Sequence, residues 1–323
     1  MIVAYVVQIK KTGGAEVLAY LEKDLAAPGE GEVQIRQSVI GVNFVDIYFR
    51  LGMYPLPSLP HVLGLEGAGV VVAVGAGVSD FSPGDRVAYA GLPVGGYADF
   101  RNLPAGRLVK IPDNVTDRVA GSNMLRGLTA HMLLNKIYPL QPGDYLLVHS
   151  AAGGLGQMLA RWAKMLGANV IGTVSSEPKI EVAKAAGVDH VILRKNNSWV
   201  AQVKELSGGQ GVHFAYDGIG ADVLHQTMGV VRPFGVLASL GQAGGAIPAV
   251  DVHDIRCISL SRPSVIAYSL DPALYRPAAE DLLARLPSGL ANPVGAEYAL
   301  ADATQAHEDL EAGRTTGSVV LVP

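Results

Sequence analysis

The feature that most constrains the fold is a glycine-rich turn between a short apolar strand and a helix. The run Leu146-Leu147-Val148 enters an A-x-G-x-x-G turn, from Ala151 to Gly156, and continues into a helical segment that ends near Leu166. Glycine lets the backbone approach a pyrophosphate closely and lets the helix lie tight on the strand, and the free N–H groups at the helix start attract phosphate. The pattern therefore predicts a dinucleotide ligand.

The context of the turn supports this interpretation. Ala151 stands where the common fingerprint has its first glycine, which weakens the motif on its own. The following segment, Asn169–Val174, is typical of a second buried parallel strand and completes a βαβ unit of about thirty residues. The alternative is a glycine turn that only lets a helix pack on a sheet.

The end of that second strand indicates which dinucleotide binds. NAD enzymes place a carboxylate there for the ribose hydroxyls, whereas this chain has Ser175 and Ser176, followed by Lys179 and, further on, Arg194. Small hydroxyls with nearby cations suit a 2′-phosphate, so NADPH is favoured over NADH. Two alternatives stay open, because Lys179 could be a solvated helix residue and Glu177 could offset the positive charge.

Composition excludes several classes of protein. The chain has 323 residues, of which 49% are hydrophobic and 17% charged, so it can form a compact soluble protein with two domains. A net charge of −4 without a basic cluster argues against nucleic acid and anionic membranes as partners. The start, Met1–Lys10, predicts a first strand rather than a signal peptide, and we expect a cytoplasmic protein.

The chain has a single cysteine, Cys257. It allows neither an internal disulfide nor a multi-cysteine zinc site. We expect it to be a small buried residue of a strand.

Short apolar runs separated by proline and glycine predict a β-rich domain up to about residue 124. From 125 to 265 strand and helix patterns alternate, which predicts an α/β doubly wound parallel sheet. Its later strands, Val212–Asp217 and Gly235–Leu240, are each closed by glycine. Ligands of such sheets lie beyond the carboxyl ends of the strands, so we expect Asp217, Gly218, Gly241 and Gln242 near the nicotinamide, with ordinary turn chemistry as the alternative.

Four strings carry a family resemblance: N-x-x-D-x-Y-x-R-x-G-x-Y-P at 43–55, GLEGAG at 64–69, RGLTA at 126–130 and GRTTG at 313–317. With them the whole chain resembles the medium-chain dehydrogenase/reductase superfamily, and within it the zinc-free quinone oxidoreductases related to zeta-crystallin. The resemblance implies a GroES-like β-rich catalytic domain at 1–124 and 266–323, a Rossmann domain at 125–265, and an active site in the interdomain cleft.

The residues at the family's zinc positions argue against a metal. Zinc alcohol dehydrogenases of this superfamily have a cysteine where Asn43 stands, a histidine where Leu65 stands, and a four-cysteine lobe that is missing here. Asparagine and leucine cannot replace thiolate and imidazole as zinc ligands. We therefore expect Glu66 to be a buried, hydrogen-bonded structural carboxylate.

Hydride transfer to a quinone develops negative charge on an oxygen, so the site needs hydrogen-bond donors and a surface that stacks on a flat ring. By the resemblance, Asn43 is the donor that orients the carbonyl, Tyr48 and Tyr54 are ring contacts and donors, and Arg262 adds positive charge; packing is the alternative for the tyrosines. The resemblance also places Thr129 beside the nicotinamide, and at Arg194 the family often has tyrosine. The residues expected at the pyrophosphate are Ser150, Ala151, Gly153, Gly154, Leu155 and Gly156.

These features predict an NADPH-dependent quinone oxidoreductase. The nearest alternative is an NADPH-dependent reductase of α,β-unsaturated carbonyls, and a more distant one is a non-catalytic NADPH-binding protein. The family usually forms homodimers through an edge strand, for which we expect the segment 256–261 to serve.

Overall fold

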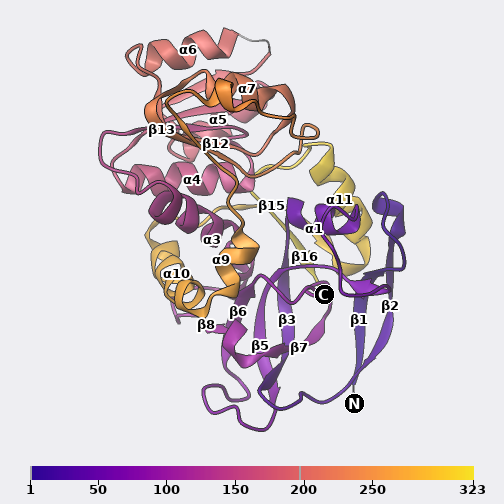
Figure 1. The fold of residues 1–323 in the computed structure, drawn as a ribbon. Helices are drawn as coiled ribbons and strands as arrows, with labels where there is room; N and C mark the ends of the chain where they lie inside the picture. Colours follow the sequence, from indigo (N-terminus) through magenta and orange to yellow (C-terminus); the bar gives the residue numbers. More distant parts are fainter. Residues whose placement is uncertain (1, 196–197) are drawn as a thin grey trace. The chain divides into compact units, whose positions relative to one another are not determined.

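The computed structural model describes residues 2–195 and 198–323. It divides into two compact units, a first unit of Met1–Leu128 with Ile266–Pro323 and a second unit of Thr129–Val265. Figure 1 follows the chain through both units. Across the described residues, no helix combines the length and the apolar character that a bilayer crossing requires.

The second unit is built on one parallel sheet with the strand order β11-β10-β9-β12-β13-β14. This is the order of dinucleotide-binding folds, in which the winding reverses between the first and fourth strands and opens a ligand crevice at their carboxyl ends. In chain order the strands are β9 (Tyr145–Val148), β10 (Asn169–Val174), β11 (His190–Leu193), β12 (Val212–Asp217), β13 (Val231–Ser239) and β14 (Ser259–Ser261).

Two of the predicted strands, β10 and β12, are confirmed with the expected bounds. They are short apolar runs closed by turn residues, and Ile171 and Ala215 are fully buried in the core of this unit. The strand expected at Gly235 begins earlier, at Val231, because β13 bulges: Val212 pairs with Val231, and Phe214 then pairs with Val236. A bulge interrupts the alternation of side chains along a strand, so the sequence pattern predicted only the part of β13 that follows the bulge.

The helix after the glycine turn, α4 (Gly154–Met165), confirms the strand-turn-helix prediction. It buries Met158, Leu159 and Trp162, which lie on one face because they are three and four positions apart. The other helices of this unit are α5 (Pro178–Ala185), α6 (Ser198–Leu206), α7 (Ala221–Met228) and α8 (Val252–Ile255).

The first unit contains a three-stranded sheet, β2-β1-β4, and a larger sheet, β15-β16-β3-β5-β6-β8, in which β7 also pairs with β3. The carboxyl-terminal strand β16 pairs with β3, so the last residues of the chain complete the sheet that β3 and β5 begin. The strands are β1 (Ile2–Ile9), β2 (Leu18–Leu25), β3 (Glu32–Val42), β4 (His61–Val62), β5 (Glu66–Val74), β6 (Arg86–Ala90), β7 (Phe100–Pro104), β8 (Val109–Lys110), β15 (Val294–Ala299) and β16 (Ser318–Val322).

Short helices connect these strands. The first, α1, begins directly after β3 and carries the N-x-x-D-x-Y-x-R string identified in the sequence. The others are α2 (Asp117–Gly121), α3 (Met124–Met132), α9 (Val265–Leu270), α10 (Pro272–Arg285) and α11 (Ala303–Glu311), and α1 spans Phe44–Arg50.

The prediction for Cys257 was wrong. The cysteine is exposed, and it lies in a turn between α8 and β14 rather than in a strand. The strand expected over 256–261 shortens to Ser259–Ser261 because Arg256 adopts a positive φ of 49°, which breaks the extended backbone.

Candidate active site

The glycine turn of the second unit, which we call the cradle, has little room for side chains at two of its glycines. A Cβ on Gly156 would lie 2.3 Å from the carbonyl oxygen of Ser150, and one on Gly153 would lie 3.2 Å from the same oxygen. Ser150 itself has a positive φ of 53°, which turns the chain sharply after β9. Helix α4 therefore begins tight against the turn after β9 with no side chain between them, which is the packing that a pyrophosphate-binding turn requires.

Ala151 replaces the first glycine of the common fingerprint without disturbing this turn. Its side chain is fully buried and its N–H donates to the carbonyl of Thr173 at 3.0 Å. The space comes from Gly172 on the neighbouring strand β10, where a Cβ would lie only 2.7 Å from that of Ala151. The departure from the motif is thus compensated one strand away.

The residues nominated for the 2′-phosphate follow β10 and β11. The Lys179 ammonium lies 3.4 Å from the Ser175 hydroxyl, and Ser176 lies between them in the chain. Glu177, which could have offset the positive charge, pairs with Lys195 at 2.9 Å, and this contact lowers the pKa of its carboxyl. The carboxylate therefore has its own cation.

Arg194 is half-buried, and its N–H donates to the carbonyl of Val174 at 2.9 Å. Burial lowers the pKa of His149, which directly follows β9, and raises the pKa of Asp217, the last residue of β12. The positive charge of Arg194 lowers both pKa values by a smaller amount.

Polar groups gather where β12 and β13 end. The Asp217 Oδ1 accepts the N–H groups of Ile219 and Gly220 at 2.8 and 3.3 Å, whereas its Oδ2 lacks a hydrogen-bond partner among the described residues. Asp217 pairs in register with Ser239, and the buried Ser239 hydroxyl also lacks a partner within that part of the chain. Asp217 Oδ2 and the Ser239 hydroxyl are thus two buried polar atoms that could bind a polar ligand.

Other nominated residues surround this pair. The Arg262 guanidinium donates to the Ser239 carbonyl at 3.1 Å. A Cβ on Gly241 would lie 2.4 Å from the Gly218 carbonyl oxygen, so these two turns touch, and Gln242 follows directly. The sequence reasoning missed Ser239, although its register with Asp217 on adjacent parallel strands was a usable signal.

Thr129 and His149 are both buried. The His149 ring nitrogens lie 2.8 Å from the Thr173 hydroxyl and 2.9 Å from the Thr227 hydroxyl. Burial, with a smaller contribution from Arg194, lowers the pKa of His149 to about 3, so the ring is neutral and structural.

The catalytic residues nominated in the first unit begin at the start of α1. Asn43 precedes this helix, is 7% exposed, and its backbone N–H donates to the Asp46 carboxylate at 2.8 Å, as in a capping box. Tyr48 and Tyr54 pack edge to face with ring centroids 5.9 Å apart, and Phe49 packs on Tyr54 in the same way at 5.5 Å. The structure therefore brings the two tyrosines into one aromatic cluster.

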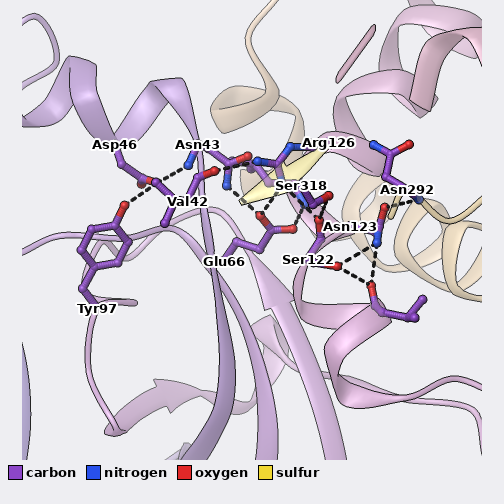
Figure 2. A network of polar contacts seen from close by, with 12 residues as sticks. Val42, Asn43, Asp46, Glu66, Tyr97, Ser122, Asn123, Arg126, Asn292 and Ser318 are labelled. Carbon is purple, nitrogen blue, oxygen red and sulfur yellow. Dashed lines mark hydrogen bonds and ion pairs between the residues drawn. The ribbon is translucent and has the colours of Figure 1, made fainter. Parts of the chain in front are cut away.

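Glu66 is the structural carboxylate that the sequence predicted, which is confirmed. It is fully buried and accepts hydrogen bonds from the Asn43 amide (2.7 Å) and the Leu125 N–H (2.9 Å), and the Arg126 guanidinium lies 3.8 Å away (Figure 2). Burial raises the pKa of Glu66, while Arg126 and the hydrogen bonds lower it. Within the described residues, no group of three His, Cys, Asp or Glu side chains is arranged to hold a metal ion.

A buried chain of polar side chains extends behind Asn43. The Tyr97 hydroxyl lies 3.2 Å from the Asp46 carboxylate and 2.8 Å from His307 Nε2, and the Arg50 guanidinium lies 3.1 Å from His307 Nδ1. Burial raises the pKa of Asp46 to about 7 and lowers that of His307 to about 3. Sequence reasoning missed this chain because Asp46 and His307 are far apart in the sequence.

Comparisons with known proteins agree with both units. Residues 29–113 match the alcohol dehydrogenase GroES-like domain family and residues 154–283 the zinc-binding dehydrogenase family. The quinone oxidoreductase of Pseudomonas aeruginosa is 39% identical over 98% of this chain and 99% of its own length. The chain belongs to the zinc-free quinone oxidoreductases of the medium-chain dehydrogenase/reductase superfamily.

Two further members of this superfamily bear on its chemistry. The crystal structure of Escherichia coli quinone oxidoreductase complexed with NADPH superposes with a TM-score of 0.95, at 37% identity, over 99% of this chain and 100% of the other. The 2-haloacrylate reductase of a Burkholderia species is 38% identical over 98% of each chain. This quinone oxidoreductase family member thus resembles both a quinone reductase and a reductase of an activated alkene.

Proposed function

We propose that this protein is an NADPH-dependent quinone oxidoreductase that works without a metal. The observation that carries the proposal is the cradle at the start of α4, combined with the hydroxyls of Ser175 and Ser176 directly after β10 and a neighbouring Lys179, while the carboxylate of Glu177 is paired with Lys195. NADPH, when bound, supplies the hydride. The solved E. coli relative in complex with NADPH supports the same cofactor.

Residues of the second unit fit this cofactor. The glycines and Ser150 would hold the pyrophosphate, and Ser175, Ser176, Lys179 and Arg194 would bind the 2′-phosphate, since cations and hydroxyls bind it as charge-assisted donors. The polar groups Asp217 and Ser239 suit the carboxamide of a nicotinamide, because one offers an acceptor and the other a hydroxyl. In this proposal the Rossmann domain binds the cofactor and the GroES-like domain binds the substrate.

Residues of the first unit would act on the quinone. Asn43 would donate an N–H to the carbonyl oxygen that becomes negative. In the second unit, Arg262 lies against the Ser239 carbonyl and would add positive charge where β13 ends. The cluster of Tyr48 and Tyr54 would offer a ring surface and hydroxyl donors. The protein needs no general acid, because the hydroquinone product can take its proton from water.

The deciding experiment is NADPH oxidation by purified, chelator-treated protein, followed by absorbance with a simple para-quinone, an aliphatic enone, and NADH in place of NADPH. We expect turnover on the quinone with a preference for NADPH. An Arg194→Ala variant should lose the preference for NADPH over NADH while keeping turnover. Absence of turnover with NADPH bound would refute the proposal in favour of a non-catalytic NADPH-binding protein.

Reduction of α,β-unsaturated carbonyls is the second candidate. The similarity to 2-haloacrylate reductase favours it, because that protein is named for an activated alkene. Both reactions place negative charge on an oxygen, so the same donors would serve. Turnover on the enone without turnover on the quinone would decide for this candidate.

We also propose that the protein is a cytoplasmic homodimer. Strand β14 ends the parallel sheet, and Phe234, held at a positive φ of 66°, is 88% exposed in the neighbouring bulge. An exposed aromatic side chain beside a sheet edge suits a second copy of the chain. Light scattering should give twice the chain mass of 33.7 kDa, and Phe234→Ser should lower it. A monomeric mass would refute the dimer.

The exposed thiol of Cys257 supports a reducing compartment, which cell fractionation would test.

A further inference from the structure

The Asn43 amide is held by a buried carboxylate that the proposed chemistry does not itself use. Its Nδ2 lies 2.7 Å from Glu66 Oε2, while Glu66 Oε1 accepts the Leu125 N–H at 2.9 Å. Both oxygens of Glu66 therefore act as acceptors, one toward the fixed backbone N–H of Leu125 and one toward the Asn43 amide, whose contact with Glu66 is drawn in Figure 2. A carboxylate cannot donate while it is ionised, so the amide must turn its nitrogen toward Glu66.

Arg126 holds this carboxylate and the backbone next to Asn43 at the same time. Its guanidinium donates to the Val42 and Ser122 carbonyls and lies 3.8 Å from Glu66 Oε2. Arg126 and Glu66 are 7% and 0% exposed. A buried pair of this kind is rigid, because neither side chain can move without leaving the other charge unpaired.

The Glu66 side chain fits beside strand β3 because that strand has a glycine, Gly41, at the point of contact. Gly41 on β3 lies across from Glu66, and a Cβ there would be 2.2 Å from Glu66 Oε2 and 2.6 Å from its Cδ. Any other residue at 41 would push the carboxylate away from Asn43. The φ angle of Gly41 is not positive, so its backbone conformation does not demand glycine. Glycine is required because any side chain at this position would collide with Glu66.

We infer that Glu66 is a positioning residue that sets the direction of the Asn43 amide and so aims its remaining N–H at the substrate oxygen. The inference rests on the proposed function, in which Asn43 is the donor to that oxygen. One N–H of the amide is taken by Glu66, which leaves one for the substrate. The same contact fixes which end of the amide is nitrogen.

Glu66→Gln separates this role from packing, because the two side chains have the same shape. The Leu125 N–H cannot turn, so the oxygen of the new amide stays on it and the new NH2 faces Asn43. Two NH2 groups then meet, and Asn43 must flip to present its oxygen. Loss of one donor to a developing oxyanion costs roughly 10²- to 10³-fold in kcat, and we expect roughly 10²-fold here.

Two more variants sharpen the test. Gly41→Ala keeps the charge of Glu66 but displaces its carboxylate, and it should lower kcat for the quinone in the same direction. The double variant Asn43→Asp with Glu66→Gln restores a hydrogen bond of reversed polarity, so it should recover most of the lost melting temperature but not kcat. Asp117→Asn is the matched control: it removes a carboxylate that pairs with Arg86 at 2.7 Å, and should lower the melting temperature without lowering kcat.

The readouts are kcat for the quinone, KM for NADPH, melting temperature, and the side-chain amide protons of selectively ¹⁵N-labelled asparagine. We expect unchanged KM for NADPH and a downfield Asn43 amide proton that shifts upfield in Glu66→Gln and Gly41→Ala. The inference is overturned if Glu66→Gln and Gly41→Ala both keep the wild-type kcat, or if the chemical shift of the Asn43 amide proton is unchanged in them. It is also overturned if the double variant regains kcat together with stability. A wild-type protein that shows the downfield proton but reduces no quinone would refute the proposed function and leave the positioning intact.

Discussion

Replacing Arg50 by methionine should destabilise the first unit by about 3 kcal/mol. The Arg50 side chain is 1% exposed and makes three contacts: Nε donates to the Gly13 carbonyl at 3.1 Å, Nη1 to His307 Nδ1 at 3.1 Å, and Nη2 to Glu311 Oε1 at 2.8 Å. Since arginine is always a donor, His307 Nδ1 is the acceptor and its Nε2–H points to Tyr97.

The magnitude follows from what each partner loses. The Gly13 carbonyl and His307 Nδ1 are left without a donor, at about 1 to 3 kcal/mol for each buried polar group. Glu311 is 35% exposed and can be solvated, so it adds little. Methionine replaces the apolar stem of the arginine and removes the desolvation of its charge, which offsets part of the loss.

Glu311→Gln is the matched control. The glutamine keeps an oxygen acceptor for Arg50 at the partly exposed end of the network, and we expect a loss of about 1 kcal/mol. The two variants therefore change the same ion pair from its buried and its exposed side.

Hydrogen exchange of the β16 amides, resolved by peptide, measures the effect in the first unit, where Val319, Val320 and Leu321 are fully buried. Both tryptophans, Trp162 and Trp199, lie in the second unit, so their fluorescence follows that unit separately. The reasoning would be refuted if the opening free energy of the β16 amides in Arg50→Met differed from that of the wild type by less than about 1 kcal/mol. The same conclusion would follow if it equalled the value for Glu311→Gln.

Three further outcomes are expected. Gly156→Ala should weaken NADPH binding about tenfold or more and Gly153→Ala far less, measured by fluorescence titration, because a Cβ would lie 2.3 Å from backbone in the first case and 3.2 Å in the second; equal affinities would contradict the cradle. His307 has a folded pKa of about 3, below its ordinary 6.5, so its stabilising contribution is present above pH 6.5 and is lost as the pH falls toward 3. Urea unfolding of His307→Gln should therefore depend less on pH between 6 and 4, by about 1.4 kcal/mol per pH unit, and parallel curves would exclude this assignment. A thiol reagent should modify Cys257 in the folded protein, and a reaction that requires denaturant would contradict its exposure.

The sequence by itself determined the features that depend on neighbours in the chain. The strand Asn169–Val174, the strand Val212–Asp217 and the turn that enters α4 were predictable, because apolar runs, glycine and proline act on backbone conformation within a few residues. The same local logic identified the candidate phosphate residues and the cations after β10. It failed at Cys257 and at the start of β13, where a positive φ and a bulge interrupt the pattern.

Only the tertiary structure decided which polar groups meet. Asn43 and Glu66 are 23 residues apart, and Tyr97 and His307 are 210 apart, so no local pattern brings them together. The pairing of β3 with β5 brings the first two residues together, and the return of the carboxyl-terminal segment to β3 brings His307 into the first unit. Burial then gives these contacts their effect, because water no longer competes for the donors and acceptors, and each buried polar group has to find its partner within the protein.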